Sequence, residues 1–260
     1  MTQTDLDLAH AAMEAAPQDD AKRLQFYERL ADSELYILLA SQAEGDQIEP
    51  AIFEADGMRF VPVFDRESRL ADFTGRAAPY AAMPGRALAQ MLVGQGIGLG
   101  FNLQAAPSQM LIPPEALTWL VATLANAPVE TQARLTEIAA PHGLPEAVVT
   151  GLDRKLAIAA GLAKWAYLAA ATYEDGVKGH VLAFVDAKDG AEDALANAAS
   201  EALTFSGIEA GMMDVMFVRA DDPVAAHLAK VGLRFDLPEI GQPQPPAAPG
   251  SDPDKPPRLR

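Results

Sequence analysis

Four histidines are the residues in this sequence best suited to metal binding or proton transfer. They are His10, His142, His180 and His227. None stands at the spacing of a paired ligand set such as H-E-x-x-H, and the sequence has no cysteine that could complete a zinc site. The sequence therefore predicts no metal centre. The lack of cysteine also excludes disulfides, thiolate nucleophiles and iron–sulfur clusters.

A glycine-rich stretch, GQGIGLG at residues 94–100, is the feature closest to a cofactor motif. A dinucleotide loop needs G-x-G-x-x-G after a strand and before a helix, so that the helix N-terminus faces the pyrophosphate. Here Leu99 follows Gly96 where the third glycine is needed, and a predicted helix precedes the glycines while a strand follows. We expect no cofactor. We interpret these glycines as a helix end, a turn and two points of close packing.

The sequence does not indicate a catalytic serine or a catalytic carboxylate pair. No serine lies in G-x-S-x-G. Adjacent acids occur at residues 19–20, 192–193 and 221–222, each at the start of a predicted helix, where the helix dipole favours negative charge. The sequence favours a non-catalytic interaction or regulatory protein, with an enzyme of unrecognised type left open.

An aromatic strand, KWAYLAAATY at residues 164–173, is the first candidate for a binding surface. Alternation along a strand places Trp165, Tyr167 and Tyr173 on one face and small residues on the other. We expect helices to cover the side of the small residues. The aromatic face then contacts the first domain, the outcome we favour, or a partner or ligand. Asp214, an acid within a predicted strand, is expected on that same face.

A turn, PHGLP at residues 141–145, is the second candidate, with His142 and Gly143 as its ligand-binding residues. It lies between the first strand and first helix of the predicted second domain. Regulatory domains with this order of elements bind amino acids near that turn, which is an argument from fold analogy. The turn therefore supports an alternative function, a small-ligand (amino-acid) sensor.

The net charge of the chain limits the classes of partner that we expect it to bind. The chain has 260 residues, with 20 Lys and Arg against 36 Asp and Glu, a formal net charge of −16. Binding of nucleic acid or an anionic membrane needs clustered cations, so we expect neither. We expect a protein or small-molecule partner, and the oligomeric state stays open. The first eighteen residues have no Lys or Arg, which predicts no secretory signal and a cytoplasmic location.

Hydrophobic periodicity and turn residues predict an α/β chain of the α+β class with two small mixed domains. We place an N-terminal helical extension at residues 1–19, the first domain at 20–127, the second at 128–237, and a disordered proline-rich tail at 238–260. The second domain has the element order of a ferredoxin-like β-α-β-β-α-β sandwich, with an added helix and strand. Pro62 lies in a predicted strand and favours an edge position for it. Predicted helices cover residues 5–15, 87–93, 115–125, 145–160, 191–205 and 223–230, with another after Asp19 or Asp20, and predicted strands cover residues 34–40, 58–64, 97–103, 133–140, 164–173, 180–186, 212–218 and 232–236.

These segments together resemble the SseB family, which is named for enhanced serine sensitivity. SELYILLA, FVPVFDRESRLADF, PGRALAQMLVGQGIGLGFN and LIPPEALTWL are similar to its amino-terminal domain. GLPEAVVTGLDRKLA, KWAYLAAA, HVLAFVD and MMDVMFV resemble its carboxy-terminal domain. The chain departs from the family at Leu103–Gln104, where members often carry Pro-Gly. The resemblance implies a link with amino-acid metabolism and supplies no catalytic residue.

Overall fold

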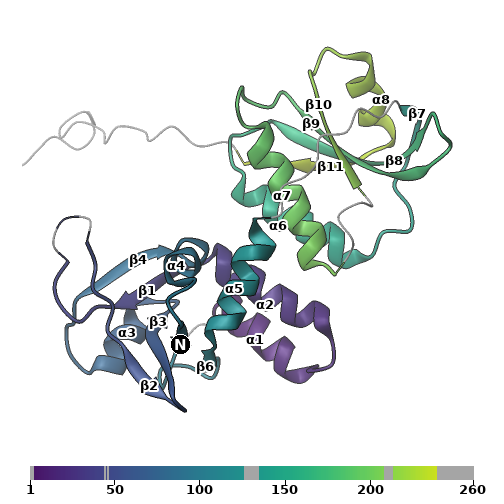
Figure 1. Ribbon diagram of the computed structural model, residues 1–260. Coiled ribbons are helices and arrows are strands. Elements are labelled where there is room, and N and C mark those ends of the chain that lie inside the picture. The colour runs from purple at the N-terminus through teal and green to yellow at the C-terminus, as the bar shows by residue number, and fades with distance from the viewer. Residues whose placement is uncertain (1–2, 44, 46, 126–134, 208–212, 239–260) are drawn as a thin grey trace, which may run out of the picture. The chain divides into compact units, whose positions relative to one another are not determined.

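The computed structural model describes residues 3–43, 45, 47–125, 135–207 and 213–238. Within these residues the chain has helices and two mixed sheets, which confirms the α+β class (Figure 1). The chain divides into two compact units. Unit 1 comprises residues 1–132, 145–152 and 199–212, and unit 2 comprises residues 133–144, 153–198 and 213–260. The tail predicted to be disordered lies, from residue 239 on, outside the described residues.

Unit 1 begins with two helices whose N-terminal capping residues can be predicted from the sequence. Helix α1, Asp5–Ala15, follows Thr4, which accepts a hydrogen bond from the Asp7 backbone N–H and completes a capping box with the Asp7 side chain. Helix α2, Asp20–Asp32, follows Asp19, whose side chain accepts from the Ala21 backbone N–H. The two helices pack against each other (Figure 1).

The sheet of unit 1 has the strand order β4-β1-β3-β5-β6, and the short strand β2 pairs with β3. Its strands are β1 Glu34–Leu38, β2 Phe53–Ala55, β3 Met58–Phe64, β4 Tyr80–Pro84, β5 Ile97–Phe101 and β6 Met110–Ile112. Helices α3 Glu67–Thr74, α4 Gly85–Leu92 and α5 Pro114–Leu124 connect or follow them. The β3–β5 pair is parallel, and the other pairs are antiparallel.

One face of this sheet forms the main core. Alternate residues such as Leu35, Ile37, Val61 and Leu99 are buried in a cluster that also includes apolar residues of α1, α2, α4 and α5. Because side chains alternate across a strand, the residues between them belong to the opposite face. On that opposite face helix α3 packs against β3 and β1, while the residues of β4 on this face are exposed.

The glycine-rich stretch takes the structural roles that the sequence predicted. The two glycines that follow α4 have φ of 80° and 66°, which belongs to the left-handed region that favours glycine. A Cβ at Gly98 or Gly100 would lie only 2.8 Å from the ring of Phe60 or Phe53, respectively. These two positions let the aromatic rings pack directly onto β5.

The edge position predicted from Pro62 is wrong, because β3 lies inside the sheet with β5 on one edge and both β1 and β2 on the other. The Val63 carbonyl accepts from the Asn102 N–H on the β5 side, so the nitrogen of Pro62 points to the opposite edge. There the pairing of β3 with β2 stops at residue 60 and its pairing with β1 stops at residue 63. The missing N–H of proline therefore falls in a gap between two strands, where no ladder bond is lost.

Unit 2 contains a sheet with the order β10-β9-β8-β11, and β7 also pairs with β8. Its strands are β7 Leu135–Ala139, β8 Trp165–Tyr173, β9 Lys178–Val185, β10 Met213–Val218 and β11 Leu233–Asp236. The helices of the second half of the chain are α6 Glu146–Ile158, α7 Glu192–Phe205 and α8 Pro223–Val231. Strand β11 pairs with the first half of β8 and β7 with its second half.

The predicted order of elements is correct in the second half, but the sheet is not the antiparallel one expected of a ferredoxin-like sandwich. Strands β9 and β10 are parallel. Helix α7 connects them, and a helical crossover is what a parallel pair requires. Strand β7 pairs with β8 alone, at an edge that it shares with β11.

The longest apolar region of the sequence, residues 156–171, does not form one continuous element. Helix α6 ends at Ile158 and β8 begins at Trp165. Among the described residues, no helix is long and apolar enough to cross a bilayer.

Candidate functional site: an open sheet face with two tyrosines

Unit 1 contains a buried ionic cluster that joins α1 to the rest of the unit. The Arg69 guanidinium contacts the Asp7 carboxylate at 2.5 Å and the Asp65 carboxylate at 2.7 Å. All three side chains are at most 7% exposed. Asp65 directly follows β3, and Arg69 lies one helical turn later in α3, so the i,i+4 spacing presents both groups to α1.

Neutral side chains complete the hydrogen bonding of this cluster. The Ser108 hydroxyl donates to Asp7 at 2.6 Å, and the Asn102 amide donates to Ser108 at 3.0 Å. The Thr4 hydroxyl donates to Asp65 at 2.5 Å. Buried charge is tolerated when it is paired and hydrogen-bonded. Because its groups bind one another, we interpret the cluster as structural.

The cluster changes the acidity of Asp7. Burial alone would raise the pKa of this carboxyl group, but hydrogen bonds from Arg69, Ser108 and Thr4, and the charge of Arg69, together hold the pKa well below its ordinary value of 3.8. The folded state therefore favours the ionised form of Asp7 more than the unfolded chain does.

This shift predicts an acid-dependent loss of stability. A carboxyl group with a lowered folded-state pKa contributes stability that is fully present well above pH 3.8 and is lost as the pH falls through the folded-state pKa. We expect Asp7→Asn to flatten the fall of the unfolding free energy below that pH, measured by urea unfolding. Asp5→Asn, an exposed acid in the same helical turn, should leave the slope unchanged. Equal slopes for the wild type and Asp7→Asn would contradict the prediction.

The open part of the unit 1 sheet lies over β4 and β1, on the face opposite the main core. Cross-strand register pairs Tyr36 with Ala82, and Leu38 with Tyr80. Ala82 is exposed and Tyr80 is 40% exposed, while Tyr36 is half-buried. Strand β4 is also an edge strand of the sheet. We call this region, made of Glu34, Tyr36, Leu38, Tyr80, Ala82 and Pro84, the β4–β1 face.

Two tyrosines and two carboxylates meet on this face. The Tyr36 and Tyr80 rings have their centroids 5.7 Å apart and are tilted by 56°. The Tyr36 hydroxyl donates to Glu34 at 3.2 Å. A side-chain hydrogen bond to Glu67, in the first turn of α3, is the main cause of a raised pKa at Tyr80. The hydrogen bond to Glu34 is likewise the main cause of the raised pKa of Tyr36.

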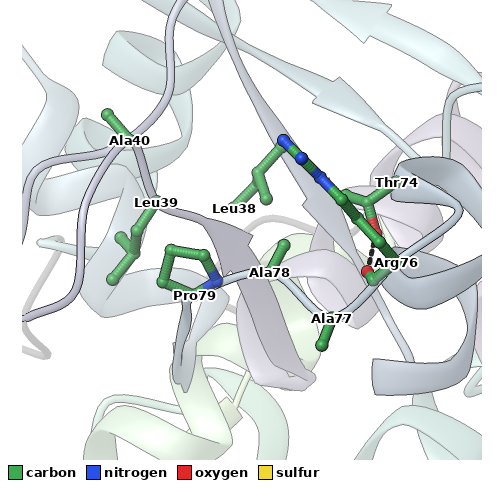
Figure 2. A pocket seen from close by; sticks show the side chains of 8 residues that line it. All are labelled: Leu38, Leu39, Ala40, Thr74, Arg76, Ala77, Ala78 and Pro79. Carbon is green, nitrogen blue, oxygen red and sulfur yellow. Dashed lines mark hydrogen bonds between the residues drawn. The ribbon is translucent and has the colours of Figure 1, made fainter.

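A shallow groove of about 460 Å³ begins beside the β4–β1 face (Figure 2). It is lined by Leu38, Leu39, Ala40, Thr74, Arg76, Ala77, Ala78 and Pro79. The Thr74 hydroxyl donates to the Arg76 carbonyl oxygen at 2.6 Å and braces the loop that follows α3. Arg76 is the charged residue of this lining, and no ion pair joins it to another described residue. A guanidinium in such a position is suited to a carboxylate.

The predicted ligand turn lies on the surface of unit 2 beside a second histidine. The carbonyl oxygen of His142 is 3.0 Å from His180 Nε2, and the two ring centroids are 6.3 Å apart. Gly143 has φ of 74°, and a Cβ there would meet nothing within 4 Å. Groups of three or more possible metal ligands are absent from the described residues. Ligand binding at this turn stays a prediction.

The aromatic face of β8 is more covered than the sequence suggested. Tyr167 is 6% exposed and lies in an apolar cluster with Leu228 of α8. Trp165 packs partly against this cluster, and its ring lies 4.8 Å from the guanidinium of Arg234. A helix of the same unit thus covers a face that we expected to lack helices. In the predicted sandwich α8 is an added helix with no sheet face to cover.

Tyr173 and Asp214 meet on that same face, as the sequence predicted for Asp214. The Tyr173 hydroxyl donates a hydrogen bond to the Asp214 carboxylate. The strand register supports this placement of Asp214. Asp214 lies opposite Val181, which belongs to the same apolar cluster as Tyr167. Burial, this hydrogen bond and the Asp214 charge all raise the pKa of Tyr173. A role of this pair in binding stays a prediction.

The sequence alone does not point to the residues of the β4–β1 face or of the buried cluster. Its local patterns predict no element over residues 65–84, which contain α3 and β4. The i,i+4 spacing of Asp65 and Arg69 was a usable signal for α3. The five-residue strand β4 ends in proline and offered a weaker signal.

Residues 8–119 match the family model described as the SseB protein N-terminal domain. This segment therefore forms an SseB N-terminal domain. The matched segment includes the whole β4–β1 face, Glu67 and the groove at Arg76, so the candidate site lies within the SseB domain. No curated protein and no solved structure gave a significant match.

Proposed function

We propose that the chain is a non-catalytic interaction or regulatory protein that binds a protein partner through the β4–β1 face of its SseB domain. The observation that carries this proposal is the Tyr36–Tyr80 pair, which stands on a sheet face that α3 covers only in part. The family name links such proteins with serine sensitivity, and we propose that this one acts in the cytoplasm.

Tyrosine is suited to such a surface. Its ring supplies a large rigid contact area with little rotamer entropy to lose, and its hydroxyl group forms hydrogen bonds at the rim. Tyrosine is enriched among interface residues that dominate binding energy. The exposed edge strand β4 adds backbone groups that a partner strand can pair with.

The buried polar groups of unit 1 also support a non-catalytic role. The side chains of Asp7, Asp65 and Arg69 are at most 7% exposed, and their hydrogen bonds go to one another and to neutral neighbours. A catalytic group must reach a substrate, and these side chains are instead engaged in joining α1 to the sheet.

The proposal is tested by comparing proteins that co-purify with the full chain and with Tyr80→Ala. We expect at least one protein to be lost from the variant, with an unchanged melting temperature, because Tyr80 is exposed. Glu54→Gln, an exposed acid on β2, is the matched surface control and should retain that protein. If every co-purifying protein is retained by Tyr80→Ala, the β4–β1 face is not the interaction surface.

The groove at Arg76 favours a second function, amino-acid sensing. Its apolar lining and its single guanidinium suit the carboxylate of a small amino acid. A thermal-shift comparison with serine and related amino acids separates the two functions. Sensing at this groove predicts stabilisation of the wild type that Arg76→Gln removes and that Arg154→Gln, an exposed arginine in α6, retains. Absence of any shift with the wild type would rule out this alternative.

A further inference from the structure

We propose that Tyr36, Tyr80, Glu34 and Glu67 together form a receptor for an arginine side chain presented by a basic protein partner. This inference rests on the proposed function and specifies the chemistry of the partner. It concerns one small region of the β4–β1 face, together with the first turn of α3.

The geometry brings aromatic and acidic groups from three elements to one place. Glu34 and Tyr36 are alternate residues of β1 and therefore share a face, and Tyr80 enters from β4. Glu67 reaches the Tyr80 side chain from α3. The two rings are tilted, with centroids 5.7 Å apart, and Tyr80 as a residue is 40% exposed beside the two carboxylates.

The local charge is negative. The charged groups that raise the pKa of Tyr80 are Glu67 and Glu34, and both also raise the pKa of Tyr36. A cation placed beside the rings would be attracted by both carboxylates and by the negative face of each ring. The chain as a whole carries a net charge of −16, which favours encounter with a basic partner.

Arginine fits this arrangement better than lysine. A guanidinium is planar, so it stacks on an aromatic ring while its N–H groups donate to carboxylates in the same plane. It is also less strongly hydrated than an ammonium group, so it loses less on contact with the rings. Two rings flanked by two carboxylates offer both kinds of contact at once.

The test uses the full chain and N-acetyl-arginine amide, a monocation without a free amino group. The ring resonances of Tyr36 and Tyr80 are followed by NMR during titration, with N-acetyl-citrulline amide as the neutral isostere and N-acetyl-lysine amide as the other cation. We expect saturable shifts at these two tyrosines with the arginine derivative. The citrulline derivative should bind more weakly by roughly fivefold or more. Equal binding of citrulline or lysine would overturn the inference.

Two variants test whether the carboxylates contribute to binding of the arginine derivative. Glu34→Gln combined with Glu67→Gln keeps side-chain shape and removes both charges, and it should weaken binding by about fivefold. Glu54→Gln should not change it. Shifts that persist in the double variant, or that spread over acids elsewhere in the chain, would overturn the inference.

The outcomes separate this inference from the function on which it rests. Loss of a co-purifying protein by Tyr80→Ala, without binding of the arginine derivative, overturns the arginine receptor and leaves the interaction surface standing. Binding of the arginine derivative, without any protein that depends on Tyr80, contradicts the proposed function instead.

Discussion

Replacing Arg69 with methionine is expected to lower the free energy of unfolding of the SseB domain by about 3–5 kcal/mol. The substitution keeps much of the side-chain volume but removes the charge that holds Asp7 and Asp65, both within 2.7 Å of the guanidinium. Two carboxylates would then face each other in a buried site without a cation. Leaving buried charge without its partner is among the costliest single changes in a protein.

Urea unfolding measures this loss. The chain has two tryptophans, Trp119 in unit 1 and Trp165 in unit 2, so a Trp165→Phe background restricts the fluorescence signal to unit 1. Arg23→Met is the matched control, because Arg23 forms an exposed pair with Asp20 and should change stability by less than about 1 kcal/mol. Similar losses for the two variants would show that the Arg69 cluster contributes no more than a surface ion pair.

Gly85→Ala is expected to destabilise the same domain by about 3 kcal/mol, through overpacking. A Cβ at Gly85 would lie 1.8 Å from the carbonyl oxygen of Leu30, which is backbone in α2 and cannot rotate away. The Gly85 N–H also donates to the Ser33 carbonyl at 2.9 Å, so α4 begins in direct contact with the end of α2. Accommodating one methyl group would require these two helices to separate.

The control for Gly85→Ala is Gln90→Ala, an exposed position in the same helix. Alanine there should be neutral or slightly stabilising, because it has the higher helix propensity. Both variants are compared with the wild type by urea unfolding in the Trp165→Phe background. A Gly85→Ala protein as stable as the wild type would mean that α2 and α4 are not held at the close approach that the structure describes.

Elements with strong local signals were predicted well from the sequence. Thr4 and Asp19 cap α1 and α2 as expected, and the predicted strand at residues 58–64 coincides with β3. Side-chain periodicity and capping chemistry act over a few residues, so a single sequence reveals them. The resemblance to the amino-terminal SseB domain is confirmed over residues 8–119.

The features that were missed depend on contacts between distant segments. Tyr36 and Tyr80 meet because β1 pairs with β4, in a register that places Tyr36 opposite Ala82, 46 positions later in the chain. Arg69 contacts Asp7 across 62 positions. Such pairing follows from the topology of the whole sheet, which no local pattern specifies.

The two structural corrections have the same origin. Pro62 predicted an edge strand because proline has no N–H to donate to a neighbouring strand. The structure instead shows that β1 and β2 pair with different parts of β3 and leave a gap beside Pro62. The sequence predicted that Tyr167 lies on an open face of the sheet. That prediction was wrong because the predicted sandwich gave α8 no position. The prediction that this face serves a partner now concerns its less buried residues, Trp165, Tyr173 and Asp214.

The central claim, that the β4–β1 face binds the partner, is tested most directly by photo-crosslinking in intact cells. Benzoylphenylalanine replaces Tyr80 in one variant of the full chain and Trp165 in a second variant. Trp165 represents the alternative binding surface, on unit 2. The account predicts a discrete crosslinked protein adduct from position 80 and none above background from position 165. An adduct from position 165 alone, or from neither position, would contradict it.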